Sequence, residues 1–216
     1  MKDENRIILA LDVKREEEAL RICDATKDYV DAFKVGYPLV LNVGIEIMGG
    51  LKEFGKPIIA DFKIADIPSV SETICTTAVD NGADFVIVQG FVGEEVIKSC
   101  SKCAKIFVVC EMSHEGAKDF MEDQANDIAE MAKKYAYGIV APATRPERIT
   151  WLRDIVGGEM VIISPGIKAQ GASIGDAIRA GADYEIIGRG IYQAKDPGRA
   201  AKAYREILKR DKPISR

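Results

Sequence analysis

The chain has 216 residues, of which 47% are hydrophobic and 30% charged, and its formal net charge is −4. This size and composition predict a single globular domain over residues 1–216 with a substantial core. Acidic and basic residues are interspersed, so we expect neither a nucleic-acid groove nor a membrane-surface helix. The polar start predicts no signal peptide, and no apolar run approaches the length of a membrane span. We therefore expect a cytoplasmic protein.

The five cysteines are scattered along the chain, and their odd number does not favour a disulfide framework. Cys100 and Cys103 have the C-x-x-C spacing of redox and zinc sites. They fall in a helical pattern, however, and the chain has a single histidine and no second cysteine pair. We expect reduced thiols that serve mostly as small buried apolar side chains.

Short apolar runs alternate with longer amphipathic runs throughout the chain. The expected strands cover residues 6–12, 32–36, 57–60, 85–90, 106–111, 138–140, 160–164 and 184–188. The expected helices cover residues 15–27, 38–54, a segment that begins at Pro68, 94–102, 117–134, 146–156, 174–180 and 197–208. The polar tail, about residues 210–216, is expected to be frayed.

This alternation predicts the fold class. Near-continuous apolar strands separated by helices are typical of a parallel sheet covered by helices. About eight such units predict an α/β protein closed into a (β/α)8 TIM barrel. Gly82 and Gly181 stand at equivalent helix-to-strand joints, where a helix often ends in a left-handed residue. A doubly wound open sheet is the alternative, but its usual glycine-rich first turn is here Asp12-Val13-Lys14.

The charged run Asp61-Phe62-Lys63-Ile64-Ala65-Asp66 directly follows the third expected strand. Side chains two residues apart share a face of a strand, so Asp61 and Lys63 should project together while Phe62 points the other way. Asp66 lies in the loop beyond. Three charges gathered where a strand meets its loop are costly to desolvate unless they pair. A surface ion pair, the simpler interpretation, needs only two of them.

Polar residues also recur at the other strand ends, where barrels of this kind have their active sites. Each has an ordinary interpretation alone, because Asp12 can cap a helix and Lys34 can extend toward solvent. Together they predict a charged pocket. The set comprises Asp12, Lys34, Asp61, Lys63, Asp66, Glu111, Ser113, Thr144, Arg145, Ser164 and Arg189.

The last two strand-end loops predict a phosphate site. Residues 164–171 follow the seventh strand, and Gly188-Arg189-Gly190 follow the eighth. Loops at these positions often bind phosphate through backbone N–H groups, and Arg189 can add a bidentate contact. The glycines allow close approach of the backbone. Ordinary glycine turns, the alternative, would leave Arg189 without a role.

The sequence resembles the orotidine 5′-monophosphate decarboxylase family in its short archaeal form. A D-x-K-x-x-D run alone is shared with related sugar-phosphate enzymes, but the other matching segments make the resemblance specific. They run in order over nearly the whole chain, at residues 9–12, 33–38, 61–68, 111–114, 164–166, 170–171 and 188–189.

The resemblance implies loss of CO2 from C6 of the orotate ring without cofactor or metal, giving uridine 5′-monophosphate in the last step of pyrimidine biosynthesis. It implies a homodimer in which Asp66 and Ile67 reach into the neighbouring subunit's site. The implied catalytic tetrad is Lys34, Asp61, Lys63 and Asp66. The implied substrate-binding residues are Asp12, Lys34, Ile67, Ser113, Pro165, Gly166, Ile167, Gln170, Gly188 and Arg189.

Individual roles follow from the same resemblance. Asp12 and Lys34 would hold ribose hydroxyls. Ser113 and Gln170 would contact the pyrimidine edge, and Gln170 with Arg189 would grip the phosphate. Elementary chemistry agrees with the tetrad, because loss of CO2 leaves a carbanion that the ring cannot delocalise. An ammonium group such as that of Lys63 can stabilise this charge and then donate the proton.

Two positions depart from the family pattern, with Val70 where threonine is usual and Lys168 where a small residue is common. Two other functions fit part of the sequence. A magnesium-dependent sugar-phosphate lyase or synthase of the same suprafamily would carry a glutamate at the end of the second strand, where Lys34 would repel the ion. A nucleotide-binding barrel without catalysis would not need a buried lysine beside the ring.

Overall fold

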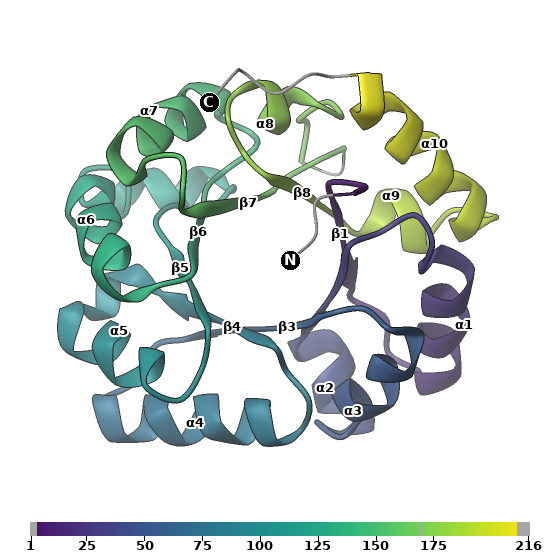
Figure 1. Cartoon of the computed structure of the whole chain (residues 1–216), viewed down its shortest axis with the longest axis horizontal. Coiled ribbons are helices and arrows are strands. Elements are labelled where there is room, and N and C mark those ends of the chain that lie inside the picture. Colours follow the sequence, from purple (N-terminus) through teal and green to yellow (C-terminus); the bar gives the residue numbers. More distant parts are fainter. Residues whose placement is uncertain (1–3, 169, 211–216) are drawn as a thin grey trace.

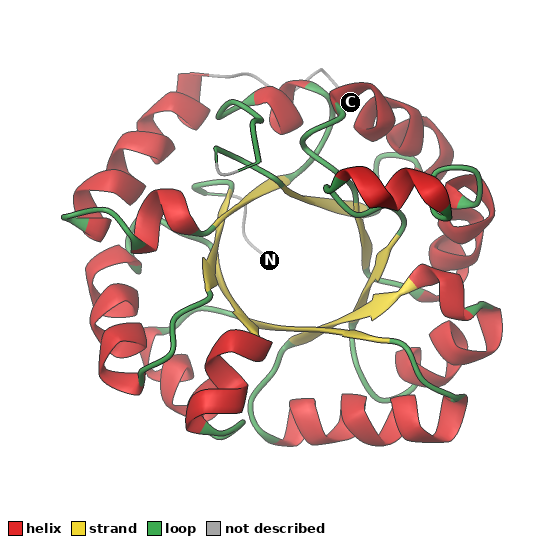
Figure 2. Ribbon diagram, turned by 180° about the vertical axis from the view of Figure 1, so that it is seen from behind, coloured by secondary structure: helices red, strands yellow, loops and turns green. Residues whose placement is uncertain are grey.

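The computed structural model describes residues 4–168 and 170–210. Eight parallel strands close into a barrel in chain order, and β8 returns to pair with β1. In Figure 1 the strands form a central ring, which the helices surround, with α1 and α10 side by side. The opposite view shows the same ring from behind (Figure 2). The predicted barrel is therefore confirmed, and an open sheet is excluded.

The elements alternate from strand to helix around the ring. The strands are β1 (Ile7–Leu11), β2 (Ala32–Gly36), β3 (Ile58–Ile64), β4 (Phe85–Gln89), β5 (Ile106–Val109), β6 (Gly138–Val140), β7 (Val161–Pro165) and β8 (Tyr184–Ile187). The α-helices are α1 (Glu16–Thr26), α2 (Tyr37–Val43), α3 (Ile47–Leu51), α4 (Pro68–Asp80), α5 (Glu94–Ser101), α6 (Ala125–Tyr135), α7 (Pro146–Val156), α8 (Asp176–Arg179), α9 (Arg189–Tyr192) and α10 (Pro197–Arg210). Short 3-10 turns are η1 (Lys52–Phe54), η2 (Gly90–Val92) and η3 (Glu115–Asp119).

Several expected boundaries are wrong. The helix expected over 38–54 is three pieces, because α2 ends at Gly44, whose φ of +96° interrupts it. The helix expected from residue 117 begins at Ala125, after η3. Helix α8 has only four residues, and α9 was not expected. Most of the expected frayed tail, residues 211–216, lies outside the described residues, whereas Arg210 ends α10.

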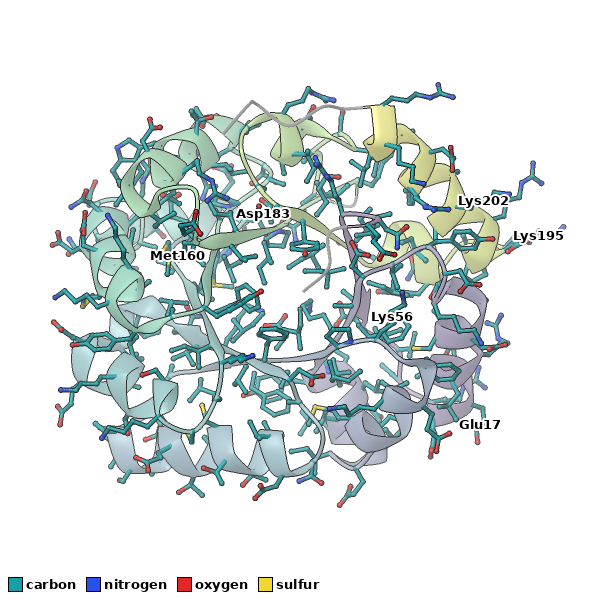
Figure 3. The ribbon with its side chains drawn as sticks, viewed as in Figure 1. Glu17, Lys56, Met160, Asp183, Lys195 and Lys202 are labelled. Atoms are coloured by element: carbon teal, nitrogen blue, oxygen red, sulfur yellow. The ribbon has the colours of Figure 1, made fainter. Side chains whose placement is uncertain are left out.

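Two apolar layers hold the barrel together. Ile8 and Ala10 of β1 belong to the cluster inside the barrel, whereas Ile7, Leu9 and Leu11 belong to the cluster between strands and helices. This alternation follows from the two-residue period of a strand. Side chains fill the centre that the ribbon leaves open, so the interior is a packed core (Figure 3).

The same inward register continues to the strand ends and changes from apolar to charged there. Asp12 follows inward-facing Ala10 by two residues, as Lys34 follows Ala32 on the next strand. Asp61 follows inward-facing Ile59 in the same way on β3. The fold therefore brings these three charged side chains to one mouth of the barrel.

A single arginine ties the entries of β7 and β8 to α7. Arg153 donates to Asp183 at 2.7 Å and to the carbonyl of Met160 at 2.7 Å. Met160 and Asp183 lie close together in this view (Figure 3). Gly181, whose carbonyl accepts from Arg153 at 3.0 Å, has a φ of +110°, and Gly82 has +102°. Both predicted glycine joints are confirmed.

No helix within residues 4–168 and 170–210 is both long and apolar enough to cross a membrane. The five cysteines are free thiols, four of them buried and Cys103 half-buried. This agrees with the prediction that they serve mostly as apolar packing.

Candidate active site

A pocket of about 420 Å³ opens at the carboxyl ends of the strands. Its volume lies within the usual range of small-molecule sites. All but two of the catalytic and substrate-binding residues that the family resemblance implied line this pocket. They are Asp12, Lys34, Asp61, Lys63, Ser113, Pro165, Gly166, Ile167, Gln170, Gly188 and Arg189.

The two exceptions are Asp66 and Ile67, which lie in the loop between β3 and α4. Both are exposed, and 62% of Ile67 is accessible. A carboxylate oxygen of Asp66 accepts the N–H of Ile67 at 2.7 Å, and the Ser71 hydroxyl donates to the Asp66 carbonyl at 2.9 Å. One copy of the chain therefore leaves both side chains outside its own pocket.

An alternating charge network occupies the mouth. Lys63 Nζ lies 2.6 Å from Asp61 Oδ1, and Lys34 Nζ pairs with Asp61 Oδ2. Asp61 and Lys34 are buried, whereas the side chain of Lys63 is 35% exposed toward the opening. The prediction that Asp61 and Lys63 project together is confirmed.

Burial and pairing have opposite effects on this network. Burial would raise the pKa of Asp61, but Lys34 and Lys63 outweigh it and lower the pKa to about 2. Burial would lower the pKa of Lys34, but Asp61 and Asp12 outweigh it and raise the pKa above its ordinary value. Asp61 and Lys34 therefore stay charged over the whole range in which proteins usually work.

The backbone that presents Lys63 is irregular. Lys63 has a φ of +42°, a backbone conformation that residues other than glycine rarely adopt. The pairing of β3 with β4 shifts between Ala60 and Ile64. Buried Phe62 points away from the pocket and stacks on Tyr37 with ring centroids 5.5 Å apart, and the Tyr37 hydroxyl donates to the Phe62 carbonyl at 2.7 Å. The strained backbone of Lys63 is therefore next to a residue, Phe62, that packing and a hydrogen bond hold in place.

The two loops expected to bind phosphate follow the neighbouring strands β7 and β8, and residues of both line the pocket. Gly166 has a φ of +113°, and a Cβ there would lie 3.0 Å from Thr144 Cγ2, so a larger residue would be strained and crowded. Arg189 is exposed and has no ion-pair partner in the described ranges. Lys168 is also exposed, with a φ of +59°.

Some polar residues at the strand ends have structural contacts instead. Glu111 is fully buried and pairs with Arg148, while Arg145 Nη2 lies 3.4 Å from its other oxygen. Buried Ser164 donates to the Ala141 carbonyl at 2.6 Å. The prediction that Glu111, Arg145 and Ser164 join the pocket is wrong, because their polar atoms brace neighbouring segments. Thr144 similarly donates to the Ser113 carbonyl at 2.8 Å.

The pocket also contains residues to which the sequence analysis assigned no role. Ile87, Val109 and Val140 form an apolar wall, and each faces the barrel interior near the end of its strand. The inward alternation of the strands could have located them. The other lining residues without an assigned role are Ala10, Gly36, Tyr37, Pro38, Met112, His114, Ile186 and Tyr192.

The residues present do not suit a magnesium ion. In the described part of the chain, no group of three or more His, Cys, Asp or Glu side chains is arranged to hold a metal. Both carboxylate oxygens of Asp61 are already paired with the ammonium groups of Lys34 and Lys63. A divalent cation would meet these two positive charges at close range.

The chain is a closed (β/α)8 barrel with a charged pocket at the carboxyl ends of its strands, which is where the enzymes of this fold have their active sites. The family model described as "Orotidine 5'-phosphate decarboxylase / HUMPS family" matches residues 5–204, and the chain belongs to this family. The resemblance inferred from the motifs is thereby confirmed.

Similar proteins support the assignment over nearly the whole chain. An orotidine 5′-phosphate decarboxylase from Methanococcoides burtonii is 51% identical over 208 residues, covering 94% of this chain and 96% of the relative. One from Thermococcus kodakarensis is 44% identical, covering 95% and 98%. The crystal structure of orotidine 5′-monophosphate decarboxylase from Methanocaldococcus jannaschii with the inhibitor BMP has a TM-score of 0.89 at 45% identity, covering 94% and 98%.

Proposed function

We propose that this chain decarboxylates orotidine 5′-monophosphate to uridine 5′-monophosphate, the last step of de novo pyrimidine biosynthesis, without cofactor or metal. The observation that carries the proposal is the Lys63 ammonium, fixed 2.6 Å from Asp61 and partly open to the pocket. Relatives about half identical to this chain carry the name of this enzyme.

Lys63 is the group that we assign to the chemical step. As the bond between C6 and the carboxylate breaks, its electron pair stays on C6 in the plane of the ring. A preorganised cation beside that carbon stabilises the developing charge. A proton then passes from Lys63 Nζ to C6, which gives the product and a neutral amine that solvent reprotonates. Asp61 orients the ammonium beforehand.

The apolar wall has a proposed part in the same step. Ile87, Val109 and Val140 line the pocket that holds the charged network. A carboxylate pays a desolvation cost against such an apolar surface, whereas neutral CO2 does not. The wall therefore favours the departing product over the bound carboxylate.

The remaining lining residues are assigned to binding. We assign Asp12 and Lys34 to the ribose hydroxyls, and Ser113 with Gln170 to the pyrimidine edge. Arg189 and Gln170 are assigned to the phosphate, at the remote end of the nucleotide. Binding energy from a remote phosphate can order the loops around the reacting carbon. Backbone contacts are assigned to Pro165, Gly166, Ile167 and Gly188.

We further propose a homodimer in which Asp66 and Ile67 complete the site of the neighbouring subunit. Exposed apolar side chains gather on the segments that follow β2, β3 and β4, at the same end of the barrel as the pocket. A patch of this kind is typical of an interface. Its members are Tyr37, Leu41, Ile67, Val70 and Phe91. The five free thiols also agree with a cytoplasmic location.

The direct experiment follows the loss of orotate absorbance with wild type, Lys63→Ala and Lys195→Ala, all in the presence of EDTA. Lys195 extends away from the barrel and serves as the matched lysine control (Figure 3). Wild type and Lys195→Ala should turn over without metal. The kcat of Lys63→Ala should fall at least about a thousandfold, because the ammonium group that stabilises the negative charge in the transition state is removed.

Binding of uridine 5′-monophosphate to Lys63→Ala separates loss of chemistry from loss of folding. We expect this affinity to stay within about tenfold of wild type. Wild-type activity that disappears with EDTA would favour the magnesium-dependent sugar-phosphate enzymes instead. Absence of turnover in wild type under all conditions would support a binding protein without catalysis.

A further inference from the structure

Glu185 is a buried carboxyl group in an otherwise apolar strand. It belongs to β8 and has no exposed surface. Its neighbours Tyr184 and Ile186 belong to the cluster inside the barrel, so Glu185 faces the layer between the strands and the helices. An apolar side chain would fill such a position without the desolvation that a carboxylate requires. The proposed chemistry at the barrel mouth makes no use of this group.

The carboxylate has specific backbone partners. Glu185 Oε1 accepts the N–H of Gly175 at 2.8 Å and the N–H of Ala177 at 3.2 Å. Both amides lie at the beginning of α8. Oε2 has no hydrogen-bond partner in residues 4–168 and 170–210. Glu185 therefore attaches the beginning of α8 to β8 through one oxygen.

These amides end the loop that carries Gln170. The loop leaves β7 at Gly166 and closes on itself, because Lys168 N–H donates to the Ala172 carbonyl at 2.7 Å and Ala172 N–H donates to the Gly166 carbonyl at 3.3 Å. Ile174 just beyond is buried. The loop is thus a closed unit, attached to β7 at one end and held by Glu185 at the other.

The strand that holds this loop also carries Arg189 beyond its carboxyl end. Glu185 and Arg189 are separated by Ile186 and Ile187 of β8 and by Gly188. We propose that Glu185 is a positioning residue for the phosphate site, fixing the far end of loop 166–175 to β8 so that Gln170 and Arg189 meet the same phosphate. The inference rests on the proposed function, because it assumes a phosphorylated ligand between these two side chains.

The charges around Glu185 are few. On α8, Asp176 is the nearest acid and is paired with Arg179 at 2.6 Å. The register partners of Glu185 are uncharged, Ile7 on β1 and Ser164 on β7. Burial raises the pKa of Glu185 to about 7, against the opposing effect of the backbone N–H groups. Because a charged acceptor forms stronger hydrogen bonds than a neutral one, the ionised form holds the loop more firmly.

The test compares two ligands that differ only in the phosphate, uridine 5′-monophosphate and uridine, by calorimetric titration. Glu185→Leu removes the acceptor, Glu185→Gln keeps one acceptor oxygen, and Ile187→Val trims the same face of the same strand without touching a loop amide. For Glu185→Leu we expect the Kd of uridine 5′-monophosphate to rise about tenfold and that of uridine by less than about threefold, because Ser113 still holds the pyrimidine edge that Gln170 shares. Glu185→Gln should recover affinity to within about threefold of wild type, and Ile187→Val should bind both ligands as wild type does.

Equal weakening of both ligands, or no weakening of either, would overturn the inference. Should Glu185→Leu fail to fold, hydrogen exchange at the amides of Gly175 and Ala177 in Glu185→Gln decides the matter. Faster exchange at these two amides than in Ile187→Val supports the anchor, and unchanged exchange contradicts it. A wild type that binds the nucleotide but does not decarboxylate orotidine 5′-monophosphate would refute the proposed function. The comparison of the two ligands would still measure the effect of Glu185 on phosphate binding.

Discussion

Asp61 accepts from two ammonium groups at once, one from the strand before it and one from its own strand. This arrangement keeps the carboxylate ionised, with its pKa lowered to about 2. Its two oxygens in turn hold Lys34 and Lys63 in fixed positions at the pocket. Charges that are already oriented need little reorganisation when charge develops on a substrate, which is the main requirement for electrostatic catalysis.

Arg189 and Lys168 provide a contrast between two basic residues near the same loops. Arg189→Ala should raise KM for orotidine 5′-monophosphate by at least about a hundredfold, because a bidentate, charge-assisted contact to phosphate is lost. Lys168→Ala should change KM by less than about threefold, because the side chain is exposed and screened by solvent. Steady-state kinetics at constant ionic strength measure both. Comparable effects of the two substitutions would contradict the assignment of Arg189.

At the residue scale, the sequence located the charged pocket because strand periodicity and strand ends are sufficient to place Asp12, Lys34 and Asp61 together. It did not indicate the positive φ of Lys63, since local propensity disfavours this conformation and the neighbouring contact from Tyr37 to the Phe62 carbonyl is a tertiary one. Glu111 was misassigned for a related reason. Its position at a strand end matches the pattern, but its two arginine partners are distant in sequence.

The irregular end of β3 receives a hydrogen bond from one side-chain hydroxyl, that of Tyr37. Tyr37→Phe removes the hydrogen bond to the Phe62 carbonyl and keeps the ring that stacks on Phe62. We expect a loss of about 1 kcal/mol in the free energy of unfolding. Because Lys63 is the next residue, kcat should fall by about tenfold or more while the fold is retained.

Denaturant unfolding and single-turnover kinetics on Tyr37→Phe give these two quantities. Tyr29→Phe, which changes a tyrosine outside the pocket, is the matched control. A Tyr37→Phe variant with unchanged kcat would show that the backbone at Lys63 does not depend on this hydrogen bond.

Strand β8 gives a pH-dependent prediction through Glu185. Its pKa of about 7 in the folded chain lies above the ordinary value of 4.5, so the folded protein binds this proton more tightly than the unfolded chain. The contribution of Glu185 to stability is therefore full below about pH 4.5 and is lost as the pH rises through about 7. Relative to Glu185→Gln, wild type should lose on the order of 3 kcal/mol of unfolding free energy over this interval.

Urea unfolding of both proteins at about pH 5 and about pH 8 measures this difference. A wild-type minus variant difference that is the same at both pH values would mean that Glu185 does not titrate in the folded protein. Ionised Glu185 lowers the stability of the fold, yet it accepts the stronger hydrogen bonds from loop 166–175. The form that positions the loop best is therefore the less stable one.

Element types were predicted more reliably than element lengths. All eight strands were expected because each is a short apolar run bounded by turn residues. The helix expected over 38–54 failed at Gly44, since a single glycine in an amphipathic pattern can either continue or end a helix. Helix α8 begins directly after Gly175, whose N–H donates to Glu185, and periodicity does not reveal such a contact between different elements.

At the scale of the whole molecule, barrel closure explains why one chain brings most of the residues assigned to the proposed site to a single pocket. Closure collects the ends of all eight strands around one pocket. Asp66 and Ile67 lie outside that pocket, on a rim with exposed apolar side chains. A two-fold arrangement of two such rims would place the loop of each copy against the mouth of the other. The proposed chemistry and the proposed dimer are therefore tested together.

Complementation between two inactive variants tests this account most directly. Lys63→Ala and Asp66→Asn are each inactive as homodimers if every site needs Lys63 from one subunit and Asp66 from the other. Mixed dimers contain one site with both native residues, so unfolding and refolding an equimolar mixture should restore about a quarter of the wild-type rate per site. Mixed dimers no more active than the separate variants would contradict the shared site and the role given to its central lysine.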